Sequence, residues 1–188
     1  MLASLLALSF CQVAVASCDL VPRLDPEFVE TEVAGVLLGD RASGTRFTST
    51  HGKGKVEDDG YIHHKYLSGS ASEVLDLVFY PGSVKNTFDK AEVRGASPLD
   101  VQRLPRLSLS GFVSRRGIEL GRSRDEIVAL LGRPQSVAEK DGRVILLYRC
   151  DSRKRCPILK RVNMPAYEAR YVFQADKLVE FSLGFPYP

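Results

Sequence analysis

The chain has 188 residues, of which 44% are hydrophobic, 26% charged and 9% aromatic. This composition excludes a collagen-like chain, a coiled coil and a disordered chain. A chain of this length buries roughly 70% of the surface that its extended form exposes, so it can build a hydrophobic core. The length suits one domain or two small ones.

The N-terminal segment has the features of a secretory signal peptide. Residues 1–17 carry no charge, and the apolar run Leu2–Phe10 is too short to span a bilayer. Two cleavage routes fit. Ala14-Val15-Ala16 allows ordinary cleavage before Ser17, whereas Val15-Ala16-Ser17-Cys18 resembles a bacterial lipobox in which Cys18 receives the lipid. Both routes predict a bacterial periplasmic protein, and the second adds a membrane anchor on Cys18.

The cysteines favour the second route. Removal of the signal peptide leaves Cys18, Cys150 and Cys156, an odd number in a compartment that oxidises thiols. A disulfide between Cys150 and Cys156, together with a lipid on Cys18, leaves no free thiol. The alternative is an unlipidated protein in which Cys18 is free or pairs with another cysteine. Because no further ligands have finger-like spacing, we predict no metal site.

Charge is distributed unevenly along the chain. Residues 1–102 carry a net charge of −5 and residues 103–188 carry +8. Residues 149–161 alone carry +5, and they favour an anionic partner. The predicted partner-binding residues are the six basic residues of this segment: Arg149, Arg153, Lys154, Arg155, Lys160 and Arg161. We expect the exposed side of a sheet to belong to the same binding surface.

Several partners fit such a surface in an envelope. They are another envelope or periplasmic protein with an acidic face, and the anionic head groups of phospholipid or lipopolysaccharide. Nucleic acid is not expected, because no recognition motif accompanies the charge. In the alternative interpretation the two halves of the chain attract each other, or the basic loop is only a solvated hairpin tip.

Comparison of the chain with itself suggests a duplication. Residues 35–39 match residues 117–121 at an offset of 82, and Tyr66–Ser70 match Tyr148–Ser152 at the same offset. A third match, at an offset of 94, would place about twelve extra residues in the second copy.

The second copy has clear local signals. Ser123 and Glu126 form a capping box, and Gly132 and Pro134 end a short helix over residues 124–131. Strands rich in branched and aromatic residues are predicted at 143–149, 167–174 and 178–185, the last two joined by a tight turn.

The first copy has similar strands at residues 61–67, 73–80 and 88–94, but residues 40–55 contain few large apolar residues and suit a degenerate helix or an ordered loop. We therefore predict an α+β protein of two tandem helix-plus-antiparallel-sheet units. The units cover residues 18–95 and 107–188, and a linker over residues 96–106 contains Pro98 and Pro105.

The segment Gly121–Pro134 and the later run Tyr171–Val179 resemble the SmpA/OmlA (BamE-like) family of small outer-membrane lipoproteins. The shared motif is Gly, then Ser or Thr, a short amphipathic helix, Leu-Gly, any residue, and Pro. The tandem arrangement also resembles the β-lactamase inhibitor protein. This resemblance implies an accessory role in outer-membrane assembly, although the assembly-machinery component of the family is a single unit, whereas this chain appears doubled and has an inserted basic loop.

Enzyme chemistry is not indicated. His63 and His64 are consecutive and would point to opposite faces of a strand, so they cannot serve one metal ion together. Residues 51–55 contain Gly-Lys pairs without the spacing of a phosphate-binding loop, and no nucleophile elbow is present. We expect a non-enzymatic, cofactor-free binding or scaffolding protein of the envelope. The alternative is a periplasmic inhibitor or immunity protein that binds a hydrolase or toxin.

Overall fold

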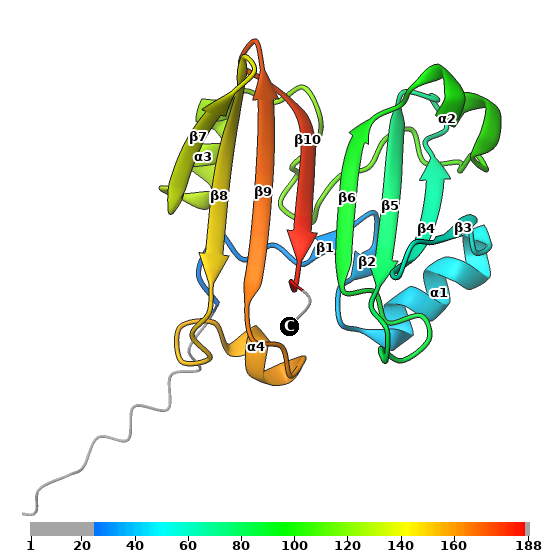
Figure 1. Ribbon diagram of the computed structural model, residues 1–188, viewed down its shortest axis with the longest axis horizontal. Helices are drawn as coiled ribbons and strands as arrows, with labels where there is room; N and C mark the ends of the chain where they lie inside the picture. The colour runs from blue at the N-terminus through cyan, green and yellow to red at the C-terminus, as the bar shows by residue number, and fades with distance from the viewer. Residues whose placement is uncertain (1–24, 187–188) are drawn as a thin grey trace, which may run out of the picture.

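A computed structural model describes residues 25–186. The strands form one eight-stranded antiparallel sheet in the order β3-β4-β5-β6-β10-β9-β8-β7, and β1 and β2 form a separate two-stranded sheet (Figure 1). The first part of the chain contains β1 (Glu32–Val33), β2 (Val36–Leu37), α1 (Arg41–His51), β3 (Lys55–Asp58), β4 (Ile62–Leu67), β5 (Glu73–Phe79), β6 (Lys90–Gly95) and α2 (Pro98–Arg103). The second contains α3 (Arg124–Leu131), β7 (Ser136–Lys140), β8 (Arg143–Cys150), α4 (Pro157–Arg161), β9 (Tyr167–Gln174) and β10 (Lys177–Gly184).

This architecture corrects the predicted fold class. Over residues 25–186 the protein is mostly β, with four short helices, and it does not consist of two helix-plus-sheet units. Strand β6 pairs with β10 over five residue pairs, from Arg94 opposite Glu180 to Lys90 opposite Gly184. Each of these strands would otherwise be an edge with unsatisfied backbone groups, and their pairing removes both edges. One hydrophobic core cluster also extends through both halves of the sheet.

The tyrosines aligned in the sequence comparison make the same contact in the two halves. The hydroxyl of Tyr66 donates a hydrogen bond to the carbonyl oxygen of Gly52 at 2.9 Å, and the hydroxyl of Tyr148 donates one to that of Gly132 at 2.8 Å. These glycines follow α1 and α3 and have positive φ angles of 78° and 76°. Each tyrosine therefore satisfies a carbonyl group at a helix end that the helix itself leaves free.

Helix α3 has the predicted bounds and both bonds of its capping box, with Ser123 as the N-cap. Helix α1 was only partly anticipated: it is a regular helix of 11 residues, although Phe47 is its one large buried side chain. Asp40 caps it by accepting hydrogen bonds from the N–H groups of Ala42 and Ser43. Helix α1 has no apolar stripe. Instead, Gly44, which has no Cβ atom, lets the helix pack closely against the backbone of Asn86.

Several elements were not expected from the sequence. Helix α2 lies within the predicted linker and begins with a capping box formed by Ser97 and Asp100. All residues of strand β7 are exposed, so this strand lacks the alternation of buried and exposed residues by which strands are recognised. The turn after β9 was predicted correctly, because Ala175 and Asp176 have the positive φ angles of a tight hairpin turn.

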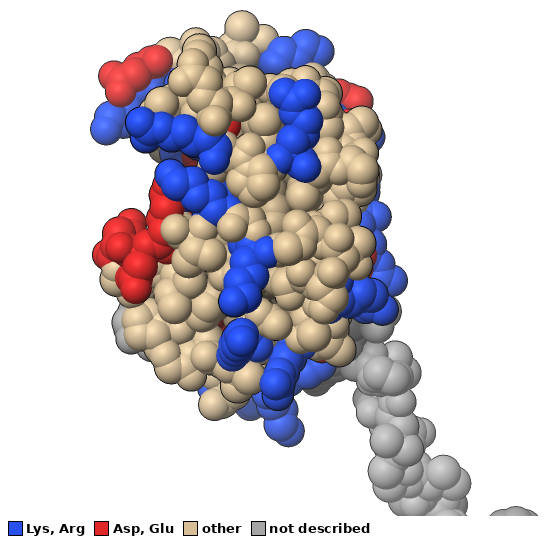
Figure 2. Space-filling view, turned by 90° about the vertical axis from the view of Figure 1, so that its right-hand side faces the viewer, with Lys and Arg blue, Asp and Glu red and all other residues tan. Residues whose placement is uncertain are grey.

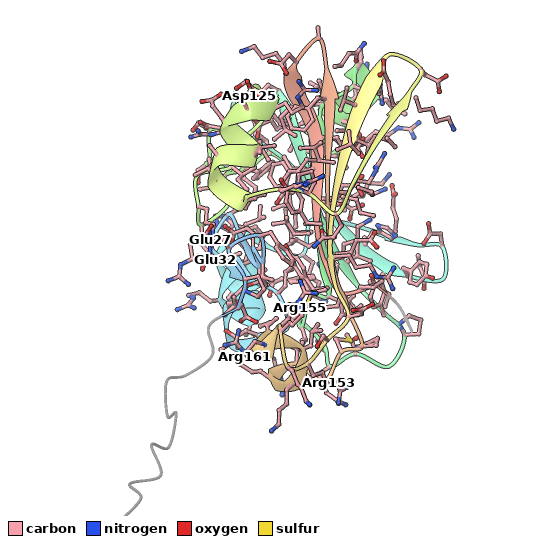
Figure 3. The ribbon with its side chains drawn as sticks, turned by 90° about the vertical axis from the view of Figure 1, so that its left-hand side faces the viewer. Glu27, Glu32, Asp125, Arg153, Arg155 and Arg161 are labelled. Atoms are coloured by element: carbon pink, nitrogen blue, oxygen red, sulfur yellow. A yellow bond between two sulfur atoms is a disulfide. The ribbon has the colours of Figure 1, made fainter. Side chains whose placement is uncertain are left out.

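The two faces of the large sheet differ. Figure 3 shows α1 and α3 on one side of the sheet, where they cover the core. Side chains of that face are fully buried, for example Leu75, Val93, Phe181 and Tyr171. Their neighbours along each strand point to the opposite face, which we call the open face. Helix α2 borders this face at one end, where Asp100 pairs with Arg94, whereas α1 and α3 lie on the other side of the sheet. Among residues 25–186, no helix is long and apolar enough to cross a membrane.

Candidate functional site

The register of the sheet places a row of mostly polar side chains across the open face. Six strands contribute one half-buried residue each, in the order Lys65, Asp76, Glu92, Ser182, Arg170 and Leu147. A neighbouring row contains His63, Val78, Lys90, Gly184, Glu168 and Arg149. Both rows cross the β6–β10 boundary, so the open face is continuous over the two halves of the sheet.

Two adjoining hollows lie on this face. The first has a volume of about 260 Å³ and spans the β6–β10 boundary; its lining includes Glu168, Arg170, Ser182 and Phe185. The second has a volume of about 350 Å³ and is lined by Tyr61, His63 and Val78. Tyr80 and Lys90 line both hollows. We call the pair the central hollow.

The charges around the central hollow are paired with one another. Arg170 contacts Glu180 at 2.6 Å, Lys90 contacts Glu92 at 3.1 Å, and Arg149 contacts Glu168 at 3.6 Å. Such half-exposed pairs add little stability. They do hold long side chains in defined positions, so the surface offers an ordered set of donors and acceptors.

His63 lies between two carboxylates at the side of the hollow. Its Nδ1 is 2.8 Å from Asp76 and its Nε2 is 3.2 Å from Asp59. Burial raises the pKa of Asp76, although its hydrogen bond with His63 acts in the opposite direction. His64 points to the covered face, and so away from His63 as predicted, and contacts Phe79 and Phe88. Burial lowers the pKa of His64.

Ser182 is the serine that lines the hollow. Within residues 25–186 it makes no hydrogen bond to His63 or to a carboxylate, the contact that would activate a serine nucleophile. Among residues 25–186, no group of three or more His, Cys, Asp or Glu side chains could hold a metal ion. The arrangement can bind a side chain of a partner through hydrogen bonds to Lys90, Glu168, Arg170 and Ser182, which line the first hollow.

The six predicted partner-binding residues fall in two places. Arg149 is on the open face. The other five, Arg153, Lys154, Arg155, Lys160 and Arg161, lie on the loop after β8 and on α4, at one end of the sheet. We call these five residues the basic end, and Figure 3 labels three of them. All five are exposed.

The basic end is held by a disulfide and by buried side chains. Cys150 and Cys156 are bonded, as predicted, and Ile158 and Leu159 of α4 are buried. Figure 2 looks onto the β3 edge of the sheet, where basic side chains are dispersed and acidic ones gather along one side of the view. The predicted signal peptide, residues 1–17, and the lipidation residue Cys18 lie outside the described residues.

No protein-family model, curated protein or solved structure matches this chain. Sequence reasoning missed most of the central hollow, including Tyr80, Lys90, Glu168 and Arg170. Finding the hollow requires the pairing of β6 with β10, and no local signal encodes that pairing.

Proposed function

We propose that this protein is an exported, non-enzymatic envelope protein, anchored by a lipid on Cys18, that binds another envelope protein on its open face. The observation that carries the proposal is the central hollow: two adjoining concave sites on an uncovered sheet face, bordered by fixed charges. Interfaces of this kind combine a recessed centre with a polar, hydrogen-bonding surround.

Export is supported by the uncharged apolar segment and the lipobox-like residues that precede the described chain. The resemblance of Gly121–Pro134 to small outer-membrane lipoproteins favours the same compartment. The Cys150–Cys156 disulfide is in keeping with an oxidising environment.

Site-specific photo-crosslinking in cells tests the binding surface. A crosslinkable amino acid replaces Ser182 in the hollow or, as the control, the exposed Ala129 on α3. We expect one discrete crosslinked species from position 182 and none from position 129. Arg170→Glu should abolish that species, because it places an acidic group beside Glu180. Equal crosslinking from both positions would contradict the proposal.

The identity of the crosslinked protein separates the two functions that the sequence left open. A structural or assembly protein of the envelope supports a scaffolding role. A hydrolase or toxin that loses activity when the purified protein is added supports the inhibitor alternative, which would use the same hollow to cover an enzyme cleft.

A further inference from the structure

The basic end differs from the open face in how its charges are satisfied. Around the central hollow, Lys90, Arg149 and Arg170 each have a carboxylate partner. Within the described chain, by contrast, Lys154, Arg155, Lys160 and Arg161 have no ion pair, and Arg153 has only a hydrogen bond to Asn163 at 3.3 Å. The positive charge of this end is therefore available to an external anion.

The polypeptide backbone holds these cations close together. The disulfide closes the loop between residues 150 and 156, and α4 follows at once, fixed by the buried Ile158 and Leu159. Lys160 and Arg161 lie in the last turn of α4, and both are exposed. The side chains thus form a compact basic tip that needs no folding transition before it binds.

The described chain begins beside this tip. The carboxylate of Asp25 accepts a hydrogen bond at 2.9 Å from the N–H of Ile158, in the first turn of α4. Figures 1 and 3 show the first coloured residues entering the fold near α4 and Arg161. Any membrane attachment through the preceding residues would start from this end of the molecule.

We propose that the basic end docks onto an anionic phospholipid surface. The inference uses the proposed anchor on Cys18 for its orientation: six residues lie between Cys18 and Asp25, and the seven steps from one to the other can span at most roughly 25 Å. An anchored molecule would therefore keep its basic tip near the bilayer and leave the central hollow free for a protein partner. Each basic residue near an anionic bilayer strengthens binding by roughly fivefold.

Vesicle sedimentation tests this without the anchor. The chain from residue 19 onward retains every buried core residue found between Phe28 and Phe185, so we expect it to fold. It should bind vesicles of phosphatidylcholine mixed with phosphatidylglycerol, should not bind phosphatidylcholine alone, and should dissociate as salt is raised. Reversal of four charges, by Lys154→Glu, Arg155→Glu, Lys160→Glu and Arg161→Glu, should weaken binding at least about tenfold.

A matched variant controls for net charge. Arg103→Glu, Arg106→Glu, Arg124→Glu and Arg133→Glu change the charge equally at exposed positions elsewhere, and this variant should keep most of the binding. Circular dichroism and thermal unfolding check that both variants fold. The proposal is overturned if both variants lose binding equally, or if the variant of the basic end binds as well as the parent chain. It is also overturned if the parent chain binds neutral vesicles equally well, or if it binds an acidic protein and does not bind vesicles.

The outcome is separable from that of the proposed function. Arg170→Glu, which should abolish crosslinking through the hollow, should leave vesicle binding within about twofold of the parent chain. Failure of vesicle binding with crosslinking intact removes only the membrane contact, and the reverse result removes only the protein partner.

Discussion

Tyr167 and Glu30 exchange two hydrogen bonds although 137 residues separate them in the chain. The tyrosine hydroxyl accepts from the N–H of Glu30 at 3.0 Å and donates to its carbonyl oxygen at 2.6 Å. The Glu30 carboxylate in turn accepts hydrogen bonds from Ser114 and from the backbone of Arg116. One buried phenol thus joins β9 to the segment before β1 and to the loop that precedes α3.

Tyr167→Phe removes these bonds without removing the ring. Because the N–H and C=O of Glu30 would remain buried without a partner, we expect a loss of about 1–3 kcal/mol in the free energy of unfolding, measured by urea titration. Tyr171→Phe is the control, since the hydroxyl of Tyr171 is buried and lacks a hydrogen-bond partner within residues 25–186. That variant should be neutral or more stable. An equal loss in both would trace the effect to packing.

Asp100 should make stability depend on pH. The Arg94 guanidinium, at 2.8 Å, and hydrogen bonds from Ser97 hold the pKa of this carboxyl far below its ordinary value. A lowered pKa in the folded state stabilises the protein above the unfolded value of about 3.9, and this contribution is lost as the pH falls towards the folded value.

Asp100→Asn should therefore cost about 1–2 kcal/mol at neutral pH, through the lost ion pair and the weakened cap of α2. The difference from the parent chain should shrink as the pH falls below about 4, measured by urea titration at several pH values. Asp176→Asn, in an exposed turn where asparagine fits the positive φ angle, serves as the control and should change little. A difference that is constant with pH would contradict the assignment.

Replacement of both cysteines by alanine tests the disulfide. The bridge closes a loop with a sequence separation of six, for which chain entropy predicts a loss of about 2 kcal/mol on removal. The comparison is between Cys150→Ala/Cys156→Ala and the parent chain, each with and without reductant, by urea titration. Reductant should destabilise only the parent. If reductant does not change the stability of the parent chain, and the variant is equally stable, the disulfide contributes nothing to the free energy of unfolding.

Gly44→Ala should destabilise the protein, although alanine normally favours a helix by about 1 kcal/mol over glycine. A Cβ atom at this position would lie 2.0 Å from the carbonyl oxygen of Asn86. The helix or the loop must move, at an expected cost of about 1–3 kcal/mol in the free energy of unfolding. Ser49→Ala, on the exposed side of α1, should instead stabilise slightly. Stabilisation by both substitutions would mean that the α1–Asn86 contact is loose.

Local chemistry accounts for what was predicted correctly. The capping box of Ser123 and Glu126, the stop at Gly132 and the turn at Ala175-Asp176 each depend on dihedral preferences and hydrogen bonds within a few residues. The Cys150–Cys156 bridge is equally local. Such features can be recognised in the sequence because the groups that make them are neighbours in the chain.

The central hollow and the sheet itself depend on groups far apart in the chain. Strands β6 and β10 carry ordinary alternating patterns, and nothing in either identifies the other as its partner. Helix α1 lacked a sequence signal for the same reason: its packing depends on the closeness of Gly44 to Asn86, and not on an apolar stripe.

The sequence by itself determined the α3 helix, the hairpin turn, the disulfide and the uneven distribution of charge, since each follows from residues that are adjacent or simply counted. The tertiary structure decided that eight strands form one continuous sheet and that the charges around the central hollow are paired. It also decided that, within residues 25–186, the basic end has no ion pair and lies beside residue 25. These outcomes depend on which strand edges meet and which side chains become neighbours on folding.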